Sequence, residues 1–238
     1  MALYAMADTH LSGSVPKSME VFGRRWVGYT EKIERRWRAL VTEDDTVVIP
    51  GDVSWATSLE EAAADFRFLN SLPGKKLIGK GNHDFWWSTV KKMQTFLRSI
   101  EVENIEFLYN NAYRVEDKIV CGTRGWFIEE GKQRSVNPVD YDKLVSREAQ
   151  RLTHCLTEAL TLRQADEEIF VFLHFPPVYD SFVCREIVEV LHQFDVRHCY
   201  YGHIHGTYSA PSTAVFEDIA FTNVAADYLD FHPLPIRS

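Results

Sequence analysis

Short apolar runs alternate with polar residues along this chain, and five of the runs end abruptly in side chains that can bind metals. Runs of this length predict buried strands. Ligands of open α/β sheets sit beyond the carboxyl ends of the strands, so neighbouring parallel strands would bring the five polar clusters to one edge. The runs and their polar ends are Leu3–Ala7 before Asp8-Thr9-His10, Val47–Pro50 before Gly51-Asp52, Leu77-Ile78 before Gly81-Asn82-His83-Asp84, Ile169–Leu173 before His174, and His198–Tyr201 before Gly202-His203-Ile204-His205.

Segments with helical periodicity separate most of these runs. In one of them, Ser58 and Glu61 form a capping box that predicts the start of a helix. An alternation of strands and helices is typical of a parallel sheet. The helices expected from the pattern are Tyr29–Leu40, Ser58–Asn70, Trp86–Ile100, Tyr141–Leu162 and 182–194.

Two further regions have a β-rich pattern. Strands are expected at Ile105–Leu108, Ala112–Val115 and Ile119–Cys121, and the Glu116-Asp117 turn predicts a hairpin that joins a second sheet. A second hairpin-like pair follows at Ala214–Glu217 and Ile219–Asn223, and Glu129–Pro138 is expected to be a polar loop. Without a repeat or a linker, the pattern predicts one domain over residues 1–238, with two sheets inside and helices outside.

Composition narrows the possible classes of protein. The chain is 45% hydrophobic and 25% charged, as in an ordinary globular protein. A net charge of −8 without a basic block argues against a dedicated nucleic-acid binder. No apolar stretch approaches the ~20 residues that span a bilayer, and a strand at the first residues leaves no room for a signal peptide. Four cysteines without CxxC spacing predict reduced thiols in a cytoplasmic protein.

The polar clusters together supply seven oxygen or imidazole donors and no thiolate. This chemistry suits Mn²⁺, Fe or Zn²⁺ better than a structural cysteine zinc site. Seven donors exceed the needs of one tetrahedral ion, so we expect two ions, one bridging carboxylate and open positions for water. Such two-metal sites favour in-line displacement at phosphorus. The donors are Asp8, His10, Asp52, Asn82, His174, His203 and His205.

Local spacing supports the same interpretation. In Asp8-x-His10 and His203-x-His205, residues i and i+2 of an extended segment point the same way. Glycines precede three of the donors, where a backbone without Cβ permits close approach: Gly51, Gly81 and Gly202.

The ordered motifs from Asp8 to His205 resemble those of the calcineurin-like metallophosphoesterases. Gly51-Asp52 continues as Val53-Ser54-Trp55-Ala56, so the aspartate and arginine of the protein-phosphatase branch are missing. The motifs are more similar to the bacterial-type branch that includes cyclic-nucleotide phosphodiesterases. The resemblance implies an α/β fold, a four-layer α/β/β/α sandwich of two mixed sheets flanked by helices.

The resemblance also implies roles and an activity. Asp8, His10 and His205 would hold one ion, Asp52 would bridge, and Asn82, His174 and His203 would complete the second, while His83 would contact phosphate and protonate the leaving group. The implied activity is hydrolysis of small-molecule phosphomonoesters or phosphodiesters by a metal-bridging hydroxide. The alternative is a non-catalytic protein-interaction scaffold on the same fold, which would be expected to lack ligands or the catalytic histidine.

Substrate contacts are less well defined by the sequence. Arg124 and Trp126 follow a predicted strand and are candidate substrate-binding residues. Lys80 is expected to be a surface charge, Asp84 a cap of the following helix, and Asp227 and Asp230 surface charges. What orients His83 is left open.

Overall fold

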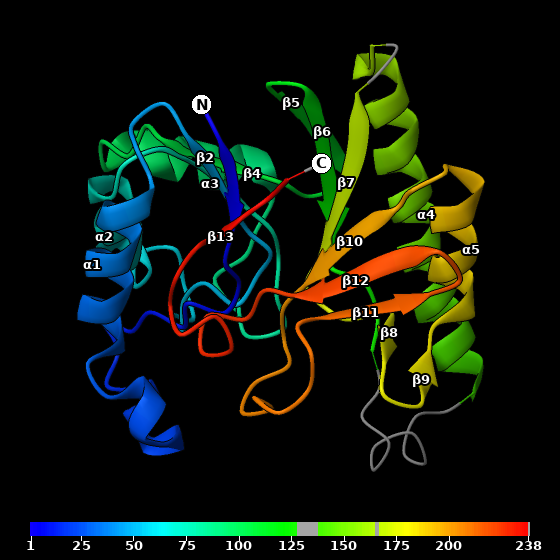
Figure 1. Cartoon of the computed structure of the whole chain (residues 1–238). Helices are drawn as coiled ribbons and strands as arrows, with labels where there is room; N and C mark the ends of the chain where they lie inside the picture. Colours follow the sequence, from blue (N-terminus) through cyan, green and yellow to red (C-terminus); the bar gives the residue numbers. More distant parts are fainter. Residues whose placement is uncertain (128–137, 165–166, 238) are drawn as a thin grey trace.

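Two β-sheets face each other in the computed structural model, which describes residues 1–127, 138–164 and 167–237 (Figure 1). The first sheet has the order β13-β1-β2-β3-β4, formed by Leu234–Pro235, Leu3–Ala5, Thr46–Ile49, Lys75–Ile78 and Ile105–Phe107. The second has the order β11-β12-β10-β7-β6-β5, formed by Thr213–Phe216, Ile219–Asn223, His198–Tyr201, Glu168–Leu173, Lys118–Thr123 and Asn111–Val115. A small hairpin pairs β8 (Val178–Tyr179) with β9 (Phe182–Val183).

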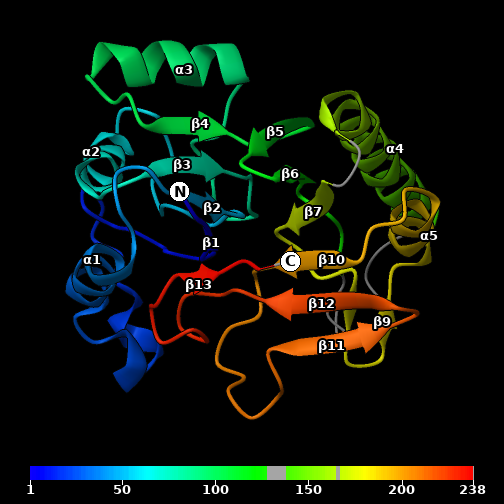
Figure 2. The same ribbon diagram turned by 45° about the horizontal axis from the view of Figure 1, so that its top comes forward.

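Helices cover the outer faces of both sheets (Figure 2). The first sheet is flanked by α1 (Tyr29–Leu40), α2 (Ala63–Ser71) and α3 (Val90–Ser99), and the second by α4 (Pro138–Leu162) and α5 (Arg185–Gln193). Two short 3₁₀ helices, η1 (Met19–Phe22) and η2 (Arg24–Trp26), precede α1. The predicted four-layer sandwich with two mixed sheets is confirmed; that residues 1–238 form a single domain stays a prediction.

Three hydrophobic clusters correspond to the three interfaces between these layers. One lies between the first sheet and its helices and includes Trp37 and Phe66, and another lies between the second sheet and α4 and α5 and includes Leu156. The third fills the space between the sheets, where Val48 of β2 and Phe172 of β7 are buried. Alternate residues of each strand therefore face different clusters, which explains why the strands read as continuous apolar runs.

The metal-binding clusters come from both sheets rather than from one edge of a single sheet. Strands β1, β2 and β3 belong to the first sheet, and β7 and β10 to the second. The sheets meet beyond these strand ends: the Ala7 amide donates to the Val224 carbonyl at 2.7 Å, and the Ala226 amide donates to the Ala7 carbonyl at 2.9 Å. This junction brings the carboxyl ends of the two sets of strands together.

Four predicted helix starts differ from the observed ones. Helix α4 begins at Pro138 rather than Tyr141, and α5 begins at Arg185 rather than at residue 182. Helix α2 begins at Ala63 rather than Ser58. Ser58 accepts from the Glu61 amide in the turn that leads into the helix, and Glu61 bonds back to Thr57 instead of Ser58. Helix α3 begins at Val90 rather than Trp86, with Thr89 as its N-cap accepting from the Lys92 amide. The α1 boundaries, Tyr29–Leu40, and both predicted hairpins are confirmed.

Other expectations concern the cysteines, the membrane and one loop. The four cysteines are free and buried, as predicted. No helix within the described residues is both long and apolar enough to cross a membrane. The predicted Glu129–Pro138 loop lies outside the described residues, except for Pro138, which begins α4.

Lys76 of β3 is a buried cation that predicts a pH-dependent stability. Its ammonium donates to the carbonyls of Leu72 and Gly74, and burial lowers its pKa from 10.5 to about 7. Below pH 7 the folded and unfolded chains both carry this proton, but between pH 7 and 10.5 only the unfolded chain holds it. The contribution of Lys76 to the free energy of unfolding should therefore rise with pH, by about 1 kcal/mol per pH unit.

Urea unfolding of the wild type and Lys76→Met at pH 7 and pH 9 tests this prediction. The wild type should gain stability relative to Lys76→Met at the higher pH, because the titration of other groups cancels in the comparison. A stability difference that stays constant between the two pH values would show that Lys76 is charged throughout.

Candidate metal centre

The seven predicted donors lie together at the junction of the two sheets. Asp8, His10 and His205 form one group and Asp52, His174 and His203 a second, and within each group the donor atoms lie within 4.8 Å of one another. In the first group, Nε2 of His10 and Nε2 of His205 are 3.1 Å apart. The seventh donor, Asn82, places its Oδ1 2.7 Å from Nε2 of His174 in the second group.

Asp52 lies between the two groups. Its Oδ2 is 3.7 Å from Nε2 of His10 and 3.6 Å from Nε2 of His174. Its other oxygen, Oδ1, accepts a hydrogen bond of 2.7 Å from the amide of His83. One carboxylate oxygen is thus directed toward both sets of donors while the other is held in place.

Hydrogen bonds orient two of the imidazoles toward the centre. Nδ1 of His174 lies 3.1 Å from the Pro50 carbonyl, and Nδ1 of His205 lies 3.0 Å from Oδ1 of Asp227. Because these acceptors take the proton of Nδ1, Nε2 is the ring nitrogen left to coordinate a metal. Partners of this kind select the tautomer of metal-binding histidines.

The backbone around the donors adopts unusual conformations. Asp8, His10, Asp52 and His203 all have positive φ, between 43° and 69°. Such residues cost roughly 1–3 kcal/mol each and cluster at functional sites. Gly81 is required for a different reason: a Cβ there would lie 2.7 Å from the Asp52 carboxyl carbon and closer still to the Asp52 amide.

Asp84 anchors the loops of two strand ends. Its buried carboxylate accepts hydrogen bonds from the amides of Asp52, Val53 and Gly81 at 2.8 Å each, and from the Trp86 indole at 3.1 Å. Burial raises the pKa of Asp84 to about 6. The expectation that Asp84 caps the following helix is wrong, because Thr89 holds that position.

The electrostatics of this centre fit bound cations. Asp8 and Asp52 are buried, and no lysine or arginine among the described residues forms an ion pair with either. Burial raises the pKa of both carboxyls and lowers the pKa of His10 and His174 well below the ordinary value. Buried carboxylates are normally paired or bound to metals, and neutral imidazoles are ready to coordinate, so this donor set suits divalent ions.

His83 borders the first group without joining it. Its ring lies 4.5 Å from the Trp55 ring and 5.7 Å from the His10 ring, and Trp55 also stacks on His10 at 4.7 Å. Lys17 lies 3.3 Å over the Trp55 ring. Burial, followed by the charges of Lys17 and His205, lowers the pKa of His83. A phosphate dianion next to the ring would raise the pKa of His83 and favour the imidazolium form.

Arg124 and Trp126 border the second group. The Arg124 carbonyl accepts from the His174 amide at 3.1 Å, and its guanidinium lies 5.7 Å from the centre of the Phe175 ring. The Trp126 ring lies 6.4 Å from Phe175, which in turn packs 4.7 Å from His203. Both candidate residues are therefore connected to the donors through Phe175.

Asp227 is a component of the centre that the sequence analysis missed. It is fully buried, not a surface charge, and it holds His205 through Oδ1. Its Oδ2 accepts from the Gly206 amide at 2.9 Å and the Tyr208 hydroxyl at 2.8 Å. Burial alone would lower the pKa of His205, but the interactions with the Asp8 and Asp227 carboxylates raise it to about 10.

Replacing Asp227 with asparagine should weaken metal binding by about 10–100-fold, the usual effect of removing a carboxylate behind a histidine ligand. Competition between the protein and a chromogenic chelator for Mn²⁺ or Zn²⁺ measures this change. Asp230→Asn is the matched control, because Asp230 pairs with Arg36 on the surface. Equal metal affinity in Asp227→Asn and wild type would rule out this role.

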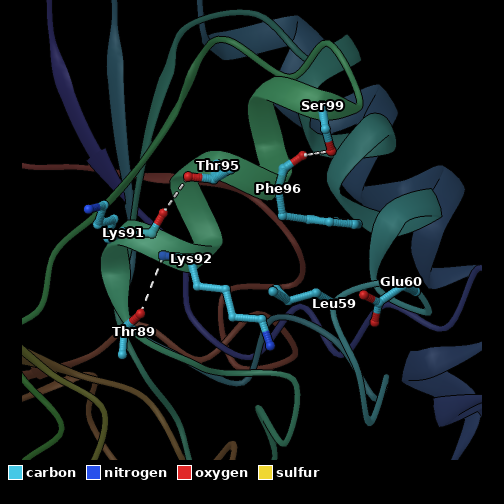
Figure 3. A pocket seen from close by; sticks show the side chains of 8 residues that line it. All are labelled: Leu59, Glu60, Thr89, Lys91, Lys92, Thr95, Phe96 and Ser99. Carbon is cyan, nitrogen blue, oxygen red and sulfur yellow. Dashed lines mark hydrogen bonds between the residues drawn. The ribbon is translucent and has the colours of Figure 1, made fainter.

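A separate pocket of about 510 Å³ opens between α3 and the segment before α2 (Figure 3). Leu59, Phe96 and Lys92 contribute to its wall, and none of the seven donors does. It is therefore distinct from the candidate metal centre.

Comparison with solved structures shows the same fold in proteins of low sequence identity. A protein of unknown function, AQ665 from Aquifex aeolicus, is 15% identical with a TM-score of 0.55, and the match covers 98% of this chain and 95% of that protein. TT1561 from Thermus thermophilus is 12% identical with a TM-score of 0.58, covering 95% and 89%. Phosphopantetheinyl hydrolase (PptH) from Mycobacterium tuberculosis is 16% identical with a TM-score of 0.56, covering 99% and 95%.

The search of curated proteins returns no match. The family model for calcineurin-like phosphoesterases, in contrast, matches residues 1–207 and so includes every strand end that carries a donor. The family match and the two donor groups together indicate a metal-dependent hydrolase of phosphoric esters. This chain belongs to the calcineurin-like phosphoesterase family.

Proposed function

We propose that this protein hydrolyses phosphomonoesters or phosphodiesters at a pair of metal ions. Asp8, His10 and His205 would hold one ion, Asn82, His174 and His203 the other, and Asp52 would bridge them. The observation that carries this proposal is the position of Asp52, whose Oδ2 lies at nearly equal distances from one histidine of each group. Bound ions would neutralise phosphate charge and lower the pKa of water enough to supply a nucleophile near neutral pH.

The remaining residues would orient the reactants. Trp55 supports the His83 ring beside His10, where an imidazolium can donate its proton to the leaving oxygen. Asp84 fixes the loops that carry Asp52 and Asn82, and Asp227 keeps the His205 ring in place. Preorganisation of this kind reduces the reorganisation that the reaction would otherwise require.

All eight proposed positions, seven donors and His83, carry side chains that suit these roles. A non-catalytic scaffold would have no need for donors in strained backbone conformations around buried carboxylates. We therefore favour the enzyme over the interaction scaffold.

The test uses p-nitrophenyl phosphate and bis(p-nitrophenyl) phosphate with protein stripped by a chelator and then reloaded with Mn²⁺, Zn²⁺ or Fe²⁺. We expect turnover of at least one ester, its loss on stripping, and its recovery with Mn²⁺. Protein that binds two ions per chain and hydrolyses neither ester would contradict the proposal. The relative rates on the two esters also distinguish a monoesterase from a diesterase.

A further inference from the structure

Two cations border the second donor group, and they come from opposite sheets. Lys80 follows β3 and precedes Asn82 by two residues, while Arg124 follows β6 and bonds to the His174 amide through its carbonyl. Lys80 is half-buried, in contrast to the surface position expected from the sequence. The two cations flank the same pair of donors, because Oδ1 of Asn82 lies 2.7 Å from Nε2 of His174.

Neither cation has a direct polar partner within the described part of the chain. The Lys80 and Arg124 side chains have no hydrogen bond or ion pair there, and Nε of Arg124 is buried without an acceptor. The nearby Arg151 differs, because Glu148 pairs with it. A buried donor without an acceptor is destabilising, and more so when it is charged, so an anion from outside would be stabilised here.

A third unused donor lies near the pair. The indole Nε1 of Trp126 is buried and has no acceptor among the described residues. Trp126 and the Arg124 guanidinium contact the same Phe175 ring, at 6.4 Å and 5.7 Å. These three donors, two of them charged, match the several acceptor oxygens of a phosphate group, which arginine can bind through two parallel hydrogen bonds.

We propose that Lys80 and Arg124, with Trp126, bind a second phosphate group of the substrate, so that the substrates are phosphate esters carrying two phosphates. The inference rests on the proposed function, because it places the first phosphate at the metal centre. Phe175 contacts both the Arg124 guanidinium and the His203 ring, so the cationic pair borders the donors across one aromatic side chain. A bisphosphate offers these cations a second phosphate, whereas a simple monoester occupies only the metal side.

The test measures binding to metal-loaded protein by calorimetry, with two non-hydrolysable ligands: propyl phosphonate and propylene bisphosphonate. The wild type should bind the bisphosphonate at least about tenfold more tightly, equivalent to about 1.4 kcal/mol. In Lys80→Gln/Arg124→Gln this preference should fall to about twofold, the statistical advantage of two equivalent ends, because the neutral side chains lose the charge-assisted contacts. Affinity for propyl phosphonate should stay nearly unchanged.

Three variants serve as controls. Lys75→Gln/Arg114→Gln removes two cations whose partners are Glu106 and Glu167, and should keep the preference. Lys80→Arg retains the charge and should keep it as well. The single variant Lys80→Gln alters a half-buried side chain and should lose part of the preference even if the double variant folds poorly.

Two results would overturn the inference. If the double variant keeps the preference for the bisphosphonate, Lys80 and Arg124 do not bind the second phosphate. Equal weakening of both ligands would place the cations on the reacting phosphate instead. This test measures binding, so a failure to hydrolyse any ester would count against the proposed function alone. A bisphosphonate preference that depends on Lys80 and Arg124 would still support the inference about the second phosphate.

Discussion

His83→Ala should lower kcat for an alkyl phosphate by about 10²–10⁴, the range expected for loss of a general acid. The loss should be much smaller for p-nitrophenyl phosphate, whose leaving group departs without needing a proton. The ring of His83 contacts Trp55 and His10, but His83 belongs to neither donor group, so the metal content should not change. Steady-state rates on the two esters, with metal analysis of the same samples, measure both effects.

The matched control for this variant is His232→Ala, which removes an exposed histidine far along the chain from the motifs. It should leave both rates unchanged. An equal loss of kcat on both esters in His83→Ala, or a loss of bound metal, would assign His83 a role other than proton donation.

Gly81→Ala should lower kcat/KM by about 10² or more, because a shift of about 1 Å in a catalytic group can have an effect of this size. A Cβ at this position would overlap with the Asp52 amide and carboxylate, and a backbone contact cannot be relieved by a rotamer change. Either Asp52 moves away from the two donor groups, or the loop that carries Asn82 moves. Kinetics and the metal content of the purified variant are the measurements.

Gly79→Ala is the matched control on the same strand end. Its Cβ would meet the Pro50 Cα at 3.2 Å, a contact that a shift of a few tenths of an ångström relieves. We expect Gly79→Ala to retain most of the activity. If Gly81→Ala retained as much activity as Gly79→Ala, the close approach of Gly81 to Asp52 would not matter for the centre.

The strands and the donors could be predicted from the sequence because their signals are local. Each donor lies within a few residues of the end of an apolar run. The rule that sites form at the carboxyl ends of parallel strands needs no knowledge of distant contacts. The rule holds although β1, β2 and β3 lie in one sheet and β7 and β10 in the other, because the two sheets join beside Ala7. The start of α2 could not be predicted from its capping box, because Ser58 and Glu61 form a turn ahead of the helix instead of its first turn.

Asp227 was missed for a different reason. Strand β12 pairs antiparallel with β11 in the predicted hairpin, but it also pairs in parallel with β10. Its carboxyl end therefore points toward the centre like the others, and Asp227 follows four residues later. The same strand-end rule would have identified Asp227 if the parallel pairing had been foreseen, but non-local pairing is not encoded in the local pattern.

Substrate contacts were the least predictable part. Lys80 and Arg124 are separated by more than forty residues and belong to opposite sheets, so their proximity depends on the packing of the whole sandwich. Isolated charges in the sequence are ordinarily solvated. Only burial and the lack of an acceptor among the described residues distinguish Arg124 from a surface arginine.

The most direct test of a two-metal centre is a crystal of the protein soaked in Mn²⁺ and measured at an anomalous wavelength. We expect two peaks ~3.5–4 Å apart on either side of Asp52. One peak should contact Asp8, His10 and His205, and the other Asn82, His174 and His203. A single peak, or peaks that leave Asp52 without contact, would contradict the account.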